Sequence, residues 1–488
     1  MIHYNAADGR RKNERRHFAG IDVRRLSAVD TRSHSRNLPG FSCKSRVNGR
    51  AMNKKEGINM KRRTIFVTCI TLVSFLFSLP LFSQSENTFI SKVAGGGDIT
   101  AAIQTKDGNY AYLNGNTIAR VSNASGKKIS ETTLLFEVPA DGFVGLQGIA
   151  ETTNGFVVVG SGALNGYYGP QTALIIAIDQ KGALQWNKTF TVNQGSSIGF
   201  DTVIPTSDGG MIVAGGVFPP DFHPMLMKFS STGEVLWSKT FESLSYSFLS
   251  KPSADGGALL LAQTFDNEGI PDGVNVLKIS DSSNIRMAVN LKIKDFSIGS
   301  LISGQNQEIL LVGKGKDPNR LSLILLNADG TVNRRAAYSL NVPDLFVSSL
   351  VQNPDGGYAI AGVLRKQTGA VYDGFLLKTD HRLKPTLLKR IGVQKIQETV
   401  SSIIASGNGG YLLFGSSAED TLFVGINDDG LVPGCGFSHN LDVQKIRFGQ
   451  VIASSLAIAP TDFSFPTPGS TNVTSKRSKR AISNVCVN

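Results

Sequence analysis

The sequence predicts an all-β fold, a seven-bladed β-propeller of four-stranded antiparallel blades. Three observations predict it: one turn-and-strand unit recurs along the chain, its period lies near 50 residues, and seven copies fill residues 88–436. A propeller blade of four short strands takes roughly 40–50 residues, so each unit corresponds to one blade. The number of units then predicts the number of blades.

Each unit begins with a short turn that ends in glycine and is followed by four or five apolar residues. A second glycine follows in six units, and Gln263 takes its place in the fourth. Asp-Gly and Asn-Gly between apolar runs are strong hairpin signals, because these residues accept the positive φ of tight turns. The turns are Asp107-Gly108, Asn154-Gly155, Asp208-Gly209, Asp255-Gly256, Asp355-Gly356 and Asn408-Gly409, with a degenerate copy at Gln305-Asn306-Gln307.

A second turn follows each of these after a further 20–28 residues or so, which divides the unit into four strands, A to D. In the third unit we expect them at 198–206, 211–214, 225–229 and 234–241. The seventh unit has no D strand, because its chain runs from Gly430 into Pro433-Gly434-Cys435. Residues 87–93 resemble the D strands of other units, so we expect them to complete the last blade and close the ring.

Residues 60–85 have the pattern of a secretory signal peptide. Lys61, Arg62 and Arg63 precede an apolar run, 64–82, and small polar residues follow, with cleavage expected after Ser83 or Ser85. A transmembrane anchor is the alternative, since the run is about as long as a short span. We expect a secreted protein, either extracellular or in the periplasm or at the outer surface of a bacterium, with no membrane span after cleavage.

Residues 1–59 are basic, with 14 Lys and Arg against 5 Asp and Glu. Because a signal peptide stands near the start of translation, we expect Met60 to be the true start and 1–59 to be an over-extended reading; a basic disordered tail is the alternative. Residues 1–63 account for the whole net charge of +12. The rest of the chain is neutral, which argues against a nucleic-acid-binding face.

Downstream of the signal peptide, we expect the propeller at 86–436 and a Ser/Thr/Pro-rich tail at 437–488. Cys435 and Cys486 are the cysteines left after processing, and an isolated pair in an exported protein predicts a disulfide. This disulfide would fold the tail back along the last blade. The basic cluster 476–480 is either a solvated surface turn or a contact for a polyanion.

The repeats at 208–215, 233–241 and 355–362 resemble those of a family of bacterial secreted propeller-repeat proteins, and the segment 429–435 with its closing cysteine is similar. The resemblance covers 88–488 and implies the fold but little about activity. Residues 232–237 are also similar to the repeat of quinoprotein propellers, in which the tryptophan serves packing between blades. With only Trp186 and Trp237 in the chain, we expect no quinone and no other cofactor.

The residues predict no catalytic set and no metal site. His223, His381 and His439 belong to different units, without metal-ligand spacing. In a four-stranded meander the B–C loops and D–A links share one face, and here the B–C loops are the variable ones, as is usual for recognition loops. The aromatic residues predicted to contact a ligand there are Tyr167, Tyr168, Phe218, Phe222 and Tyr372.

We therefore expect a monomeric, non-catalytic binding module for a protein or a glycan. Packing of the loop aromatics on neighbouring blades is the alternative for those residues. An envelope scaffold, or an enzyme that acts on a polysaccharide or uses a quinone, is the alternative for the whole protein. Clustered carboxylates at the mouth of the channel would favour the enzyme.

Overall fold

The computed structural model describes residues 88–487, apart from short gaps at 168, 193–194, 219–221, 243, 245–247, 367–370, 394–395, 407–408, 464–467 and 478–479. The predicted extension 1–59 and signal peptide 60–85 lie outside the described residues, as does Tyr168.

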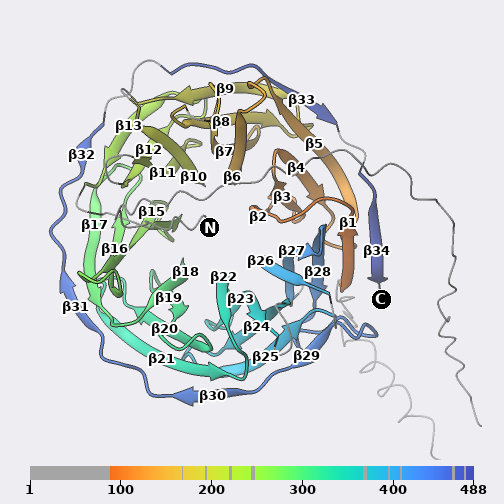
Figure 1. Cartoon of the computed structure of the whole chain (residues 1–488), viewed down its shortest axis with the longest axis vertical. Coiled ribbons are helices and arrows are strands. Elements are labelled where there is room, and N and C mark those ends of the chain that lie inside the picture. The colour runs from red at the N-terminus through yellow and green to blue at the C-terminus, as the bar shows by residue number, and fades with distance from the viewer. Residues whose placement is uncertain are drawn as a thin grey trace, which may run out of the picture. The chain divides into compact units, whose positions relative to one another are not determined.

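Seven antiparallel sheets stand around a central axis, one sheet per repeat unit, as Figure 1 shows. This confirms the predicted seven-bladed propeller. The A to D strands of the first four blades are β2(Ala101–Gln104), β3(Tyr110–Asn114), β4(Thr117–Val121), β5(Lys128–Phe136); β6(Phe143–Glu151), β7(Gly155–Ala163), β8(Thr172–Asp179), β9(Leu184–Phe190); β10(Ser197–Pro205), β11(Met211–Phe218), β12(His223–Phe229), β13(Val235–Thr240); and β14(Phe248–Pro252), β15(Ala258–Phe265), β16(Pro271–Ile279), β17(Ile285–Lys292).

Blades 5 to 7 continue the pattern, and blade 7 takes its D strand, β1, from the N-terminal end of the described chain. Their strands are β18(Ser297–Ser303), β19(Ile309–Lys314), β20(Arg320–Leu326), β21(Val332–Leu340); β22(Leu345–Gln352), β23(Tyr358–Arg365), β24(Tyr372–Thr379), β25(Pro385–Ile391); and β26(Glu398–Ala405), β27(Tyr411–Ser417), β28(Asp420–Ile426), β1(Phe89–Val93).

The hydrophobic core lies between the blades and not within them. The buried apolar side chains of the described residues form seven clusters, and each cluster joins the facing sides of two neighbouring blades. Two tryptophans add contacts between blades. Trp186 of blade 2 packs against Gly233 in the C–D turn of blade 3, and Trp237 Nε1 donates to the Asp281 carbonyl of blade 4 at 2.9 Å.

In blades 1, 3 and 4 the A–B turn has a Ser/Thr-x-Asp-Gly pattern, and the hydroxyl donates to the aspartate across the turn. In blade 3, Thr206 Oγ1 donates to Asp208 Oδ1 at 2.6 Å, and Gly209 takes the left-handed region with φ +82°. Glycine occupies that region at little cost. Buried Lys228 from the C strand pairs with Asp208 at 2.9 Å, and Lys278 pairs with Asp255 in the same way in blade 4 at 3.0 Å.

A β-bulge explains the second glycine of the repeat in every unit that has one except the first, where Gly115 has a positive φ of +52° instead. In blades 2, 3, 5, 6 and 7 the A strand carries one extra residue opposite this glycine, and the bulge directs an A-strand carbonyl into the space that a β-carbon would occupy. Glycine is therefore required for the close approach of the two backbones. The extra residues are Gln147, Asp201, Gly299, Ser348 and Ser401, opposite Gly160, Gly215, Gly313, Gly362 and Gly415.

Blade 4 departs from this pattern, and so does its sequence. The described part of its A strand, β14, pairs with β15 without a register shift, from Phe248 opposite Ala262 to Pro252 opposite Ala258. The Gln263 side chain instead donates to the carbonyls of Gly273 at 2.6 Å and Phe296 at 3.0 Å, and accepts from the Ile298 amide at 3.0 Å. The Gln263 side-chain amide thus joins blade 4 to the start of blade 5.

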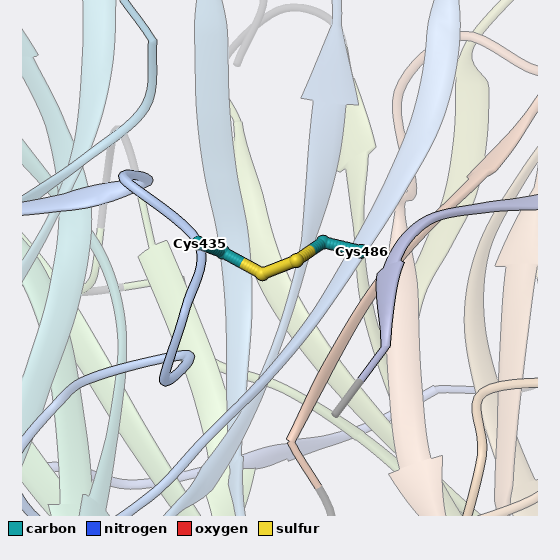
Figure 2. Close-up of a disulfide and its surroundings, with 2 residues drawn as sticks. All are labelled: Cys435 and Cys486. Carbon is teal, nitrogen blue, oxygen red and sulfur yellow. A yellow bond between two sulfur atoms is a disulfide. The ribbon is translucent and has the colours of Figure 1, made fainter. Parts of the chain in front are cut away.

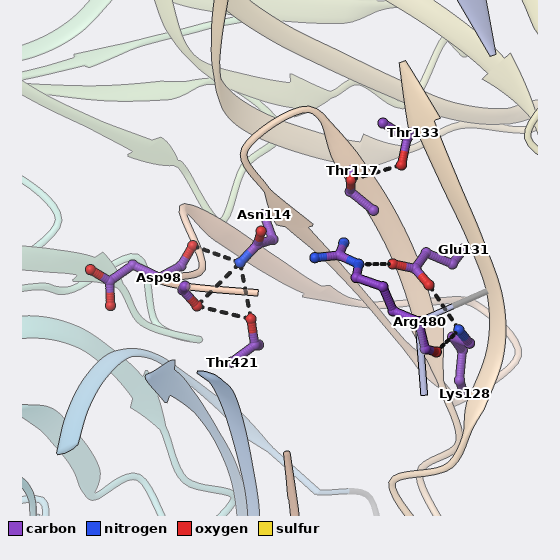
Figure 3. A network of polar contacts seen from close by, with 9 residues as sticks. Asp98, Asn114, Thr117, Lys128, Glu131, Thr133, Thr421 and Arg480 are labelled. Carbon is purple, nitrogen blue, oxygen red and sulfur yellow. Dashed lines mark hydrogen bonds and ion pairs between the residues drawn. The ribbon is translucent and has the colours of Figure 1, made fainter. Parts of the chain in front are cut away.

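The ring closes as predicted, because β1 pairs with β28 over the five residues Phe89 to Val93. Figure 3 shows the polar contacts at this seam between blades 7 and 1. Asn114 Nδ2 donates to Thr421 Oγ1 at 3.0 Å and to the carbonyls of Gly97 and Asp98 at 3.2 and 3.0 Å. Thr421 Oγ1 also donates to the Gly97 carbonyl at 2.8 Å. The seam thus combines a strand ladder with side-chain hydrogen bonds.

The C-terminal segment 437–487, which we call the belt, runs around the outer rim of the whole propeller (Figure 1). It pairs antiparallel with the outermost strand of every blade except blade 2, where a single bridge joins Thr189 to Gly469. The belt strands, in order around blades 6, 5, 4, 3, 1 and 7, are β29(Ser438–Asn440), β30(Val443–Ile446), β31(Ile452–Ser455), β32(Thr461–Asp462), β33(Val473–Arg477) and β34(Ile482–Val487).

The expectation that the tail folds back along the last blade is therefore wrong, since the tail reaches that blade only after a full circuit. The structure joins Cys435 and Cys486 in a disulfide, with the Cα atoms 6.4 Å apart, as Figure 2 shows. The disulfide thus connects the two ends of the belt. In the basic cluster 476–480, Lys476 and Arg477 end β33 and are exposed, whereas Arg480 Nε pairs with buried Glu131 Oε1 at 2.6 Å (Figure 3).

Candidate functional site

Exposed apolar side chains concentrate on the face that carries the B–C loops and D–A links, which we call the B–C face. Seven of the large exposed apolar residues in the described chain lie at strand ends or in loops of this face, in blades 2, 3, 4 and 6 and in the link from blade 6 to blade 7. They are Phe143, Tyr167, Phe218, Phe265, Ile270, Phe346 and Ile396. The others, Ile129, Leu135, Val235, Leu236, Ile452 and Val485, lie on outer strands of the rim.

Tyr167 is the most exposed of these side chains, at 64%. It follows Gly166, which has φ +101°, and its backbone amide donates to Asp141 Oδ2 at 3.3 Å. Its ring lies beside that of Phe143 from the start of β6, with the centroids 6.1 Å apart. The B–C loop and the D–A link of blade 2 thus present two aromatic rings together on the surface.

The other predicted ligand contacts divide into exposed and half-buried residues. Phe218 ends β11 and is 52% exposed. Phe222 is half-buried, because its ring covers Gly216, and Tyr372 is half-buried at the start of β24. The structure brings Phe218 and Phe222 together in blade 3, whereas Tyr372 belongs to blade 6 on the opposite side of the ring (Figure 1).

Sequence reasoning missed Phe143, Phe265, Ile270, Phe346 and Ile396: it named aromatics in the B–C loops of blades 2, 3 and 6 alone. The starts of the A strands and the D–A links lie on the same face as the B–C loops. Apolar residues at those positions could therefore have been predicted to belong to the B–C face. Phe346 at the start of β22 also has a cation above its ring, since Lys314 Nζ lies 4.5 Å from the centroid. Aromatic rings with a polar or charged partner are common in binding surfaces.

Below the B–C face, between blades 6 and 7, lies a buried cluster of charged side chains. Asp373 at the start of β24 is 1% exposed and Glu398 at the start of β26 is not exposed at all. Lys366 Nζ pairs with Asp373 Oδ1 at 2.8 Å and donates to the carbonyls of Val393 and Ile396 at 3.0 and 2.9 Å. The Lys366 ammonium therefore holds the D–A link from blade 6 to blade 7, which carries the exposed Ile396.

The charges in this cluster favour a neutral Glu398. Burial and the nearby Asp373 carboxylate raise the pKa of Glu398 to about 7. Arg390 Nε is the second cation, 3.4 Å from Asp373 Oδ2. Ser417 Oγ donates to Glu398 Oε1 at 3.5 Å and accepts from Lys92 Nζ at 2.6 Å. Both carboxyls are buried, so a substrate in solution cannot reach them. Their burial is typical of a cluster that holds structure.

The opposite face carries a cavity of about 510 Å³ at the mouth of the channel, beside the A–B turns of blades 1 to 3. Among the lining residues described, Glu151 alone is acidic, and it accepts from the Lys106 amide at 2.6 Å. The described lining residues of this cavity thus contain no cluster of carboxylates. Within the described ranges no group of three His, Cys, Asp or Glu residues could hold a metal ion.

No family model matches the chain, and no curated protein matches it. Solved structures that it is similar to include the Dos1 propeller, at 11% identity and TM-score 0.41 over 67% of this chain and 77% of that one. Another is Drosophila Plexin A in complex with Semaphorin 1b, at 11% identity and TM-score 0.39 over 69% and 87%. A third is the WD40 domain of SCAP from fission yeast, at 9% identity and TM-score 0.39 over 75% and 92%.

Identities this low carry no argument about ligands. In the part of the chain that the structure covers, no helix combines the length and the hydropathy that a membrane span requires.

Proposed function

We propose that this propeller is a non-catalytic binding module that acts outside the cell and recognises a protein through its B–C face. The observation that carries the proposal is the concentration of exposed aromatic and aliphatic side chains on that face, which is formed by loops on a rigid scaffold. The signal-peptide pattern at 60–85 and the cysteine pair support the location.

A protein partner suits this surface better than a glycan. Sugars stack on aromatic rings and form many hydrogen bonds, whereas aliphatic side chains such as Ile270 and Ile396 match only another apolar surface. Lys314, which pairs with Asp344 at 2.6 Å, lies above Phe346 and places a polar ion pair at the edge of an apolar contact, as is usual in the rim of a protein interface. The apolar residues also extend across several blades, which fits a broad interface.

The other two functions considered have less support. An enzyme would need accessible catalytic groups, but the carboxyl pair at the B–C face is buried and the channel-mouth cavity has Glu151 as its one described acidic lining residue. A scaffold without a ligand would need no exposed apolar surface on one face.

A triple variant tests the proposal. Replacing Phe143, Tyr167 and Phe218 by serine removes neighbouring contacts in blades 2 and 3, and we expect partner affinity to fall at least about tenfold, as is typical of interface anchors. The measurement is affinity capture of the secreted protein's partner from extracellular extracts, followed by the dissociation constant for the captured protein.

The matched control replaces Ile129, Leu236 and Ile452 by serine, because these side chains have similar exposure but lie on the outer rim. This variant should bind as the unchanged protein does. Equal binding by all three proteins, or a loss confined to the rim variant, would contradict the proposal. Retention on a glycan array with no protein captured would replace the protein partner by a sugar.

A further inference from the structure

The belt is built to be held at both ends. Its first residues follow Cys435, which is continuous with blade 7, and its last strand, β34, pairs with β1 beside Cys486. β34 is the edge strand of its sheet and pairs with β1 on one side only, so a covalent tie would strengthen its attachment to the rim. The disulfide supplies that tie, and it closes the belt into a covalent loop around the ring (Figures 1 and 2).

The belt contacts all seven cores, so its course around the rim is specific. Each apolar cluster between blades receives at least one belt side chain: Leu441 and Val443, Phe448 and Val451, Leu456 and Ile458, Phe463, Val473, Ile482 and Phe437. Polar anchors add to this, with Lys239 paired to Asp462 at 2.5 Å and Arg480 to Glu131 at 2.6 Å.

The belt strands are nevertheless shorter than most core strands of the blades, and they bury fewer side chains. The belt strands have two to six residues, and most belt side chains are exposed or half-buried. Short strands with few buried side chains open at low free energy even when the rest of a protein stays folded. The belt can therefore leave the rim while the blades, whose cores lie between them, remain in place.

We propose that the Cys435–Cys486 disulfide is a redox latch: its reduction lets the belt open from the β34 end and uncovers the outer strand edges of the blades, while the propeller stays folded. Both cysteines are half-buried, so a small thiol reagent can reach them. The open state exposes unpaired strand edges around the rim, including that of β1, which closes the ring.

The chemical step is thiol–disulfide exchange with a dithiol reductant. One thiolate of the reagent attacks a sulfur of the protein disulfide, forming a mixed disulfide and releasing the other cysteine as a thiolate that takes up a proton. The second reagent thiolate then attacks the mixed disulfide and closes a cyclic disulfide on the reagent. The second cysteine leaves as a thiolate and is protonated, so two cysteine thiols form as one dithiol is oxidised.

Three backbone amides of the blades donate to carbonyls of the belt, and their hydrogen exchange would show the order in which the belt opens. The Glu137 amide donates to the Asn472 carbonyl at 3.2 Å, the Thr189 amide to Gly469 at 2.9 Å, and the Gly392 amide to Phe437 at 2.8 Å. Asn472 lies nearer to the β34 end of the belt, and Phe437 lies two residues beyond Cys435. Opening from the β34 end must therefore release Glu137 before Thr189 and leave Gly392 bound.

The experiment is hydrogen exchange by mass spectrometry on the full chain, folded and oxidised first and then treated with dithiothreitol. After reduction we expect exchange to accelerate about tenfold in peptides containing β34 and Glu137, less at Thr189, and under about twofold at Gly392 and in β3, β7 and β11, the pattern of a local opening. The Cys435→Ser/Cys486→Ser variant should show the reduced pattern with or without the reagent.

Two results would overturn the proposal. Unchanged exchange on reduction would show that the strand pairs alone hold the belt, so that the disulfide is no latch. Uniform acceleration through the blade cores would show that the belt is part of the global folding unit and cannot open separately.

Discussion

Replacing Gly415 by alanine is expected to destabilise the propeller by about 3 kcal/mol or more, the upper range for overpacking a buried site. A β-carbon at this position would overlap the Thr399 carbonyl oxygen and would lie 2.7 Å from its carbonyl carbon and 3.1 Å from Val400 Cα. All of these are backbone atoms of the bulged A strand, β26, so no side chain can rotate away. The overlap can be relieved only if the bulge shifts, and the side of blade 7 that faces the channel shifts with it.

Denaturant unfolding of the alanine variant measures the loss, with the same m-value expected for both proteins. Gly145→Ala is the matched control, because Gly145 also lies in a strand, β6, but the atom nearest to a β-carbon at that position would be Gln147 Nε2 at 3.6 Å, an ordinary contact. We expect a change within about 1 kcal/mol for the control. Equal stability of the Gly415→Ala protein would refute the close-approach explanation of the repeat glycine.

The blades could be predicted from the repeat because each of its sequence features has one physical cause. Turn residues such as Asp208 and Gly209 specify hairpins locally, and the second glycine marks a bulge in the neighbouring strand. The N-terminal strand was also predictable, since Phe89 and Val93 belong to a segment that resembles other D strands. Local chemistry and a regular period were sufficient for these elements.

The belt was not predictable from the same signals. Its strands are too short to show alternation, and the edges that they pair with come from six different blades. What decides their position is the presence of open D-strand edges, a property of the assembled ring. Spaced apolar residues in a Ser/Thr-rich tail, such as Phe448, Leu456 and Phe463, were the available hint.

The candidate site was partly predictable, for a related reason. Meander topology placed the B–C loops on one face, and Tyr167 and Phe218 are exposed there. The burial of Phe222 over Gly216 depends on how its loop folds back, which residue types do not reveal. The pairing of Asp373 with Glu398 joins two blades and has no local signal in the sequence.

That buried pair leads to the second large effect, on the pH dependence of stability. Glu398 has a raised pKa of about 7, against an ordinary value of 4.5, so the folded protein binds this proton more tightly than the unfolded chain does. Between these two pH values the unfolded chain loses the proton and the folded protein keeps it. The contribution of Glu398 to stability is therefore complete below pH 4.5 and falls as pH rises toward 7, by on the order of 3 kcal/mol in all.

Glu398→Gln should remove this dependence. A glutamine carries no charge at any pH, can accept from Ser417 as Glu398 does, and has an amide that can donate to Asp373 in place of the carboxyl proton. Relative to the unchanged protein, the variant should gain stability steadily from pH 4.5 to 7 and keep a constant advantage above pH 7. Thermal and denaturant unfolding across pH 4 to 9 measures the difference.

Other groups titrate in this range in both proteins, so the difference between the two curves isolates Glu398. Asp373, Lys366 and Arg390 surround the same site, and Lys92 reaches it through Ser417; all are retained in the variant. Glu268→Gln, which removes an exposed carboxyl on the same face, is the control and should leave the curve unchanged. If the free energy of unfolding varied with pH in the same way for Glu398→Gln and the unchanged protein, the buried cluster would already compensate the Glu398 charge. The link that carries Ile396 would then be held equally well at every pH, and the B–C face would not respond to acidification.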